Sequence, residues 1–171
     1  IAKPPDISLE VPHSVREALK FGIRSTGFLP PPQPEHPTAK SRLQYLRWLD
    51  VAGKRLSPLM PEQHTRIEFL ETVWYESVRA GLPADLVLAY IHEASNFRKF
   101  AIETNGARGY MQVLPFTAGL IKDFDASRLF HMQTNLRFGC VLLRHEMEKS
   151  GGNSLIALTN YAQVYSGKTD P

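Results

Sequence analysis

Apolar residues recur every three or four positions through most of this chain, which is the spacing of amphipathic α-helices. The pattern predicts a short helix from Ser14 and further helices from Ser41, from about Pro61 to Ala80, from Pro83, from about Pro115 to Ile121, from about Asn135 to Lys149, and from Ser154 to about Tyr165. In the second of these segments, Leu43, Leu46 and Leu49 form one apolar stripe together with Tyr45 and Trp48, whose rings we expect to pack in the core. No run of alternating polar and apolar residues predicts a strand, so the predicted class is mainly α.

Residues that stop or cap helices mark the ends of several predicted segments. Gly81 follows the helix that ends near Ala80, and glycine suits the left-handed position after a helix. Asn153 precedes the last helix and suits its N-terminal cap. Residues 98–113 carry glycines but no long helical repeat, so we predict a loop or a short hairpin there.

Prolines divide the chain near its beginning. Residues 1–13 are polar in character and contain three prolines, and five of the eight residues from Pro30 to Pro37 are proline. Proline fixes φ and removes a backbone donor, so the second segment predicts a stiff spacer, which we prefer to a ligand for a proline-binding partner. We predict an N-terminal arm, short helix and linker over residues 1–40 and one folded domain over 41–171.

Composition limits the classes of function. The 20 basic and 17 acidic residues give a formal net charge of +3 and form no block of like charge, which is typical of an ordinary solvated surface. Cys140 lies in an apolar stretch and predicts a buried thiol, not a nucleophile. Neither His92 with Glu93 nor His145 with Glu146 has the histidine spacing of a zinc site, so we expect no metal and no cofactor.

Basic residues occur near the predicted loop. Arg98, Lys99 and Arg108 belong to no nucleic-acid-binding module, so we predict no nucleic-acid partner. Phe100, between them, is predicted to pack in the core. No apolar run is long enough to cross a bilayer, which predicts no transmembrane segment.

The segment from Gly81 to Pro115 is the most informative part of the chain. Its residues, and others up to about residue 167, form one ungapped pattern. The pattern is carried by Gly81, Leu82, Pro83, Asp85, Leu86, Val87, Leu88, Ala89, Ile91, His92, Ser95, Phe97, Ala101, Gly106, Ala107, Gly109, Met111, Gln112, Pro115, Thr134, Asn135, Leu136, Gly139, Leu143, Ala157, Leu158 and Tyr161. It resembles the catalytic domain of the soluble lytic transglycosylases, the SLT family. This resemblance implies a mainly α, lysozyme-like fold similar to that of goose-type lysozymes.

The resemblance implies chemistry on peptidoglycan. Soluble lytic transglycosylases cleave the β-1,4 bond between N-acetylmuramic acid and N-acetylglucosamine, and the muramic acid 6-hydroxyl closes a 1,6-anhydro ring. Ordinary glycosidases need two carboxylates, whereas this lyase step needs one that first donates and then accepts a proton. The implied partners are glycan strands and envelope proteins, and the implied location is the bacterial periplasm or cell envelope, after removal of a signal peptide.

The chain departs from this family at the acid itself. The ungapped register places Ala94 where the family has its catalytic glutamate, and a methyl group transfers no proton. Glu93 is adjacent, but successive residues lie about 100° apart around a helix, so we expect its carboxylate to point away. Glu103 replaces a serine that family members carry near the acid. Ala162 and Gln163 stand where the family usually has asparagine and glycine after the tyrosine.

Three interpretations of the missing acid stay open. The alanine is a substitution made to trap substrate, or the chain is a natural pseudoenzyme that binds glycan or scaffolds an envelope assembly, or Glu103 reaches the cleft as a substitute acid. By resemblance, Ser95, Met111, Gln112 and Tyr161 contact the glycan, although spacing alone equally predicts core packing for the methionine and the tyrosine. We expect the chain as written to bind glycan strands and to cut them weakly or not at all.

Overall fold

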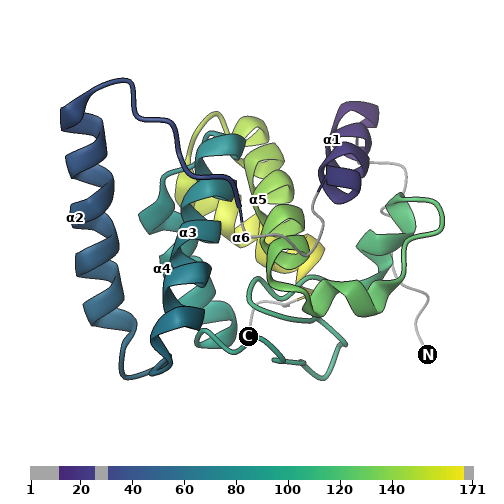
Figure 1. Ribbon diagram of the computed structural model, residues 1–171. Helices are drawn as coiled ribbons and strands as arrows, with labels where there is room; N and C mark the ends of the chain where they lie inside the picture. Colours follow the sequence, from purple (N-terminus) through teal and green to yellow (C-terminus); the bar gives the residue numbers. More distant parts are fainter. Residues whose placement is uncertain (1–11, 26–30, 168–171) are drawn as a thin grey trace.

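The computed structural model describes residues 12–25 and 31–167. Within these ranges the chain forms six α-helices and two 3-10 helices (Figure 1). They are α1 (His13–Ser25), α2 (Ala39–Leu56), α3 (Gln63–Ala80), α4 (Ala84–Ser95), η2 (Pro115–Leu120), η3 (Ala126–Phe130), α5 (Met132–Lys149) and α6 (Ser154–Tyr165). The described residues contain no strand, and residues 98–113 form a loop with isolated antiparallel bridges. The predicted mainly α fold with this loop is confirmed, and the predicted arm over residues 1–11 lies outside the described residues.

Helix α5 is the central element of the fold, because α1, α3 and α6 all pack against it (Figure 1). Its Leu136, Phe138 and Leu142 side chains are completely buried. Burial of a large apolar side chain stabilises the folded state by about 1.5–3 kcal/mol. Leu19 of α1 is also completely buried. The N-terminal segment of the sequence therefore includes a helix that packs on the folded domain.

Helix α2 contacts α3 through one face only. Tyr45 and Leu56 on that face are buried, whereas Leu43 and Leu46 are each 48% exposed. The helical period was predicted correctly, and of the two rings expected in the core, Tyr45 is buried and Trp48 is half-buried. A helix with neighbours on one side buries only part of a wide apolar face. The indole Nε1 of Trp48 donates a hydrogen bond of 2.8 Å to the Asp85 carboxylate, which ties α2 to the start of α4.

The proline-rich segment lies against helices α2 and α3 over its described part. Residues 31–36 have no regular secondary structure. The His36 ring contacts Tyr45 with 5.0 Å between centroids, and Tyr45 contacts Trp74 at the same distance. This described part of the predicted linker therefore packs on the helices that follow it.

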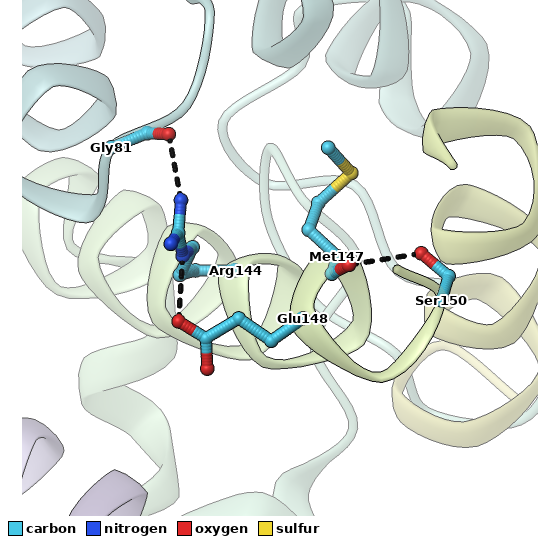
Figure 2. Close-up of polar contacts among 5 residues, drawn as sticks. All are labelled: Gly81, Arg144, Met147, Glu148 and Ser150. Carbon is cyan, nitrogen blue, oxygen red and sulfur yellow. Dashed lines mark hydrogen bonds and ion pairs between the residues drawn. The ribbon is translucent and has the colours of Figure 1, made fainter. Parts of the chain in front are cut away.

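The turn between α3 and α4 is fastened to α5. Gly81 has a left-handed φ of 69° and ends α3, as predicted. Arg144 of α5 donates one hydrogen bond to the Gly81 carbonyl at 3.1 Å and one to the Glu148 carboxylate at 2.9 Å (Figure 2). Directly after the C-terminus of α5, the Ser150 hydroxyl donates a hydrogen bond to the Met147 carbonyl (Figure 2). Asn153 then caps α6, also as predicted, by accepting a hydrogen bond from the Ile156 amide.

A buried ion pair joins α3 to α5. The side chains of Glu76 and Arg137 are 2% and 1% exposed. Arg137 donates from Nε and Nη2 to the two carboxylate oxygens, the second at 2.8 Å. Burial raises the pKa of Glu76, and the hydrogen bonds and charge of Arg137 oppose this shift. The free thiol of Cys140 is completely buried, as predicted, and burial raises its pKa, so it is not a nucleophile.

The N-terminus of α3 provides a first testable prediction. The Glu62 carboxylate accepts hydrogen bonds from the His64 and Thr65 amides at 2.9 and 2.5 Å. Hydrogen bonds from Thr65 lower the pKa of Glu62 from 4.5 to about 2. A pKa that is lowered on folding makes the ionised group stabilising above pH 4.5, and this contribution is lost as the pH falls through about 2. Carbon-13 NMR titration is expected to show this low midpoint, and a midpoint near 4.5 would contradict the cap.

Candidate active site at the end of helix α4

Helix α4 ends in a sharp turn of the backbone. Asn96 and Phe97 have φ values of 49° and 59°, which are left-handed conformations that few residues other than glycine adopt. The helix is α-helical from Ala84 to Ser95. No bulge therefore rotates Glu93 onto the side occupied by Ala94. The Glu93 side chain is 83% exposed, and its Oε1 lies 3.9 Å from Nδ1 of His92.

Ala94 lies on the inner face of α4. It is 4% exposed and belongs to the same buried cluster as Tyr90, Ile91 and Tyr161. The Tyr90 and Tyr161 rings meet edge to face at 4.9 Å. Burial raises the pKa of Tyr90 to about 12. A carboxylic acid at position 94 would be desolvated in the same way, and a raised pKa is the property that a general acid needs. The assignment of this position to the family's acid stays a prediction, and a methyl group occupies it.

The loop after α4 is held in place by one asparagine of α5. The Asn135 amide nitrogen donates to the carbonyls of Arg108 and Leu129 at 2.9 and 2.8 Å. Its side-chain oxygen accepts a hydrogen bond of 2.8 Å from the Met111 amide. Gly109 has a φ of 76°, and a Cβ at this residue would collide with the Asn135 side chain. The sequence indicated Asn135 only as a member of the family pattern, because a polar residue among the polar residues at the start of this helix gives no signal of such a role.

The four residues predicted to contact glycan are all buried. Ser95 is 2% exposed, and Met111, Gln112 and Tyr161 are completely buried. The Ser95 hydroxyl lies 2.8 Å from the Tyr110 carbonyl, and the Tyr161 hydroxyl donates to the Met111 carbonyl at 3.2 Å. These bonds hold the loop to α4 and α6. Glycan contact by the four residues stays a prediction, and their observed contacts are structural.

Two details explain why this loop packs so closely on the helices. The Met111 side chain lies directly over Gly139 of α5, where a Cβ would overlap its sulfur and carbon atoms. Gln112 has a φ of 50° and donates from Nε2 to the carbonyls of Gly109 and Ala101 at 2.8 and 3.2 Å. The Oε1 atom of Gln112 is buried and has no hydrogen-bond partner among the described residues. The loop is therefore fitted into the core by both side chains.

Glu103, the predicted substitute acid, lies on the exposed side of the loop. Its amide donates to the Ala107 carbonyl at 3.1 Å. Its side chain is exposed. In the described part of the chain, no hydrogen bond or ion pair holds its carboxylate in one position. The structure gives Glu103 neither the burial nor the fixed geometry of an acid tuned for proton transfer.

A large groove lies on another face of α4. It has a volume of about 760 Å³ and runs between α2 and α4. Its wall on α4 includes Leu88, Ala89 and His92, while Ala94 lies about 140° around the helix from Ala89. The residues that line the groove include none of the predicted site residues. It is therefore separate from the candidate active site.

Neither a metal site nor a membrane span occurs among the described residues. Within residues 12–25 and 31–167, no group of three His, Cys, Asp or Glu side chains is placed to hold a metal ion. No helix in the same ranges is both long and apolar enough to cross a lipid bilayer.

The fold and the sequence are similar to those of known lytic transglycosylases. One solved structure, an inactive glutamate-to-glutamine variant of lytic transglycosylase Slt from Pseudomonas aeruginosa, matches 74% of this chain with 26% identity and a TM-score of 0.52. The match covers 22% of that longer protein, so this chain corresponds to about a fifth of it. No curated protein matches the chain. The family model of the transglycosylase SLT domain matches residues 72–167, which is more than half of the chain. The chain therefore belongs to the transglycosylase SLT domain family.

Proposed function

We propose that this domain binds glycan strands of peptidoglycan and does not cleave them. The observation that carries the proposal is the burial of the Ala94 methyl group, at the position where the ungapped sequence register predicts the family's catalytic glutamate. The related Slt structure is described as inactive with glutamine in place of one glutamate. Alanine removes even the polar atoms that glutamine keeps.

The neighbouring carboxylates do not replace the missing acid. Glu93 points to solvent from a regular helix, and Glu103 lies exposed on the loop. An exposed carboxylate lacks the burial that prepares a general acid to donate its proton to a leaving oxygen. These placements support a domain without catalytic function over one with a relocated acid.

Differences elsewhere in the site favour a natural binding domain over a substrate trap. A single engineered substitution accounts for Ala94 but not for Ala162 and Gln163, which follow Tyr161 in place of the family's asparagine and glycine. The hydroxyl of Tyr161 is already engaged by the Met111 carbonyl. Several parts of the family's site have therefore changed together.

A location in the cell envelope follows from the proposed ligand, because peptidoglycan lies there. We place the domain in the periplasm or at the wall, as part of a protein that meets peptidoglycan strands. Removal of a signal peptide and scaffolding of envelope proteins stay predictions of the same proposal.

The proposal is tested by separating binding from cleavage. The unaltered chain is expected to sediment with purified peptidoglycan sacculi and to release no 1,6-anhydro-muropeptides, because general acid–base catalysis typically contributes about 10²–10⁴-fold in rate. Ala94→Glu is expected to release little product and to unfold more easily, since it adds a longer side chain to a packed site. Ala89→Glu is the matched control, because Ala89 is exposed on the same helix.

Each alternative gives a different result in this experiment. Product release by the unaltered chain that disappears in Glu103→Gln would identify a relocated acid. Vigorous release by Ala94→Glu would identify a substrate trap. Failure of the unaltered chain to sediment would contradict the proposed function itself.

A further inference from the structure

One aromatic side chain on the loop is exposed in spite of the prediction that it packs in the core. Phe100 is 70% exposed, and Ile102 beside it is 64% exposed. Exposed apolar patches on a folded domain mark sites of interaction. We propose that Lys99, Phe100, Ile102, Arg108 and Phe130 form a binding surface, the Phe100 platform, that holds an anionic glycan strand outside the candidate active site.

Contacts between distant parts of the chain assemble the Phe100 platform. The Phe100 and Phe130 rings lie 6.0 Å apart between centroids, and this contact joins the loop to η3. Ile102 and Arg108 face each other across an antiparallel bridge. Arg108 also donates from Nη1 to the Ala126 carbonyl at 3.1 Å. The loop and η3 are therefore held together, and the platform is a defined surface.

Cations lie at both rings of the platform. The Lys99 ammonium is 5.3 Å from the centroid of Phe100, and the Arg108 guanidinium carbon is 5.4 Å from that of Phe130. Residues 98–113 carry three basic side chains and a single carboxylate, Glu103. The surface therefore combines aromatic rings with an excess of positive charge.

This combination fits a glycan strand that carries carboxylates. The apolar face of a pyranose ring stacks on an aromatic ring, and an ammonium or guanidinium pairs with a carboxylate. Peptidoglycan strands offer both groups, because their sugars carry lactyl ethers and peptides with free carboxylates. In the platform, a sugar ring stacks on Phe100 while Lys99 and Arg108 bind the acidic substituents.

The inference rests on the proposed function and extends it. The loop that bears the platform begins directly after α4, which ends at Ser95, and also contains Gln112. We expect a strand that the domain binds to continue along this exposed surface. Binding there requires no catalytic carboxylate, which is why the surface suits a domain that has lost its acid.

The aromatic part of the platform is tested with three variants and sedimentation on sacculi. Phe100→Ala is expected to weaken binding about fivefold to tenfold, the effect of losing one aromatic stacking contact. Phe100→Tyr keeps the ring and is expected to bind as the unaltered chain does. Leu155→Ala is the matched control, because Leu155 is 75% exposed on α6, away from the platform. Both side chains are exposed, so the three variants are expected to keep the fold.

The charged part is tested by comparing two ligands. Lys99→Gln is expected to weaken binding of peptide-bearing strands about threefold at low salt, and to leave binding of a neutral N-acetylglucosamine hexamer unchanged. Phe100→Ala is expected to weaken binding of both ligands. NMR titration of the folded chain measures both affinities.

The outcomes separate this inference from the proposed function. Unaltered binding of sacculi by Phe100→Ala would overturn the platform and leave the proposed function in place. Failure of the unaltered chain to bind sacculi would overturn both. Tighter binding of a single-stranded oligonucleotide than of glycan, lost in Phe100→Ala, would overturn the choice of ligand, because aromatic and basic side chains also bind nucleic acid.

Discussion

Replacing Glu76 by alanine is expected to lower the free energy of unfolding by about 3–5 kcal/mol, because it leaves the charge of Arg137 buried without a counter-ion. The two side chains are 2% and 1% exposed, so water does not replace the lost carboxylate. Nη1 of Arg137 already has no hydrogen-bond partner among the described residues. Urea denaturation followed by circular dichroism measures the change.

Two further variants show whether burial causes this loss. Glu148→Ala removes a carboxylate from an ion pair with Arg144 that is 61% and 44% exposed, and is expected to change stability by less than about 1 kcal/mol. The double variant Glu76→Leu with Arg137→Met replaces both charges by apolar groups and is expected to recover most of the loss. Equal effects of Glu76→Ala and Glu148→Ala would contradict the interpretation.

Replacing Asn135 by alanine is expected to lower the free energy of unfolding by about 2–4 kcal/mol, because it removes two hydrogen bonds to the loop and one to η3. The Met111 amide loses its only described acceptor in this variant. Its hydrogen exchange is therefore expected to accelerate more than that of amides inside α5. Exchange measured by NMR detects the local loosening separately from the global loss of stability.

The matched control for Asn135→Ala is Asn160→Ala. Asn160 lies on α6 and makes no hydrogen bond through its side chain in the described part of the protein. Its removal is expected to change stability by less than about 0.5 kcal/mol. Unchanged exchange at Met111 in Asn135→Ala would show that other contacts hold the loop.

The helices and several of their ends were predictable from sequence because local chemistry determines them. Gly81 ends α3 in a left-handed conformation, and Asn153 caps α6. Both depend on residues within one turn of the position concerned. The helical periods of the long segments were equally clear. η3 was not predicted, because a short 3-10 helix has no sustained apolar period.

The side of each element that is buried was less predictable. Leu43 and Leu46 have the spacing of a core face but are half exposed, because α2 contacts few neighbours. Phe100 is hydrophobic yet exposed, and its ring lies 6.0 Å from that of Phe130 between centroids. Hydrophobicity and helical period are properties of a residue and its own helix, whereas burial depends on which other elements pack against that helix.

In the candidate site, too, local features were predictable and contacts between distant segments were not. The exposed orientation of Glu93 was predictable because it follows from helix geometry, whereas the assignment of position 94 to the family's acid stays a prediction. The sequence did not show that the hydroxyls of Ser95 and Tyr161 donate hydrogen bonds to the carbonyls of Tyr110 and Met111, respectively. Those bonds join segments 15 and 50 residues apart, and no local pattern encodes them.

The burial of Ala94 also bears on how this sequence can change over generations. A methyl group that is 4% exposed has neighbours that leave little room for a longer side chain. A codon change to glutamate at this position would place an ionisable group in a packed site, and selection for stability would act against it. We therefore expect glutamate to be tolerated there only together with changes in the surrounding helices. A single mutation from alanine to glutamate is then an improbable step for this sequence.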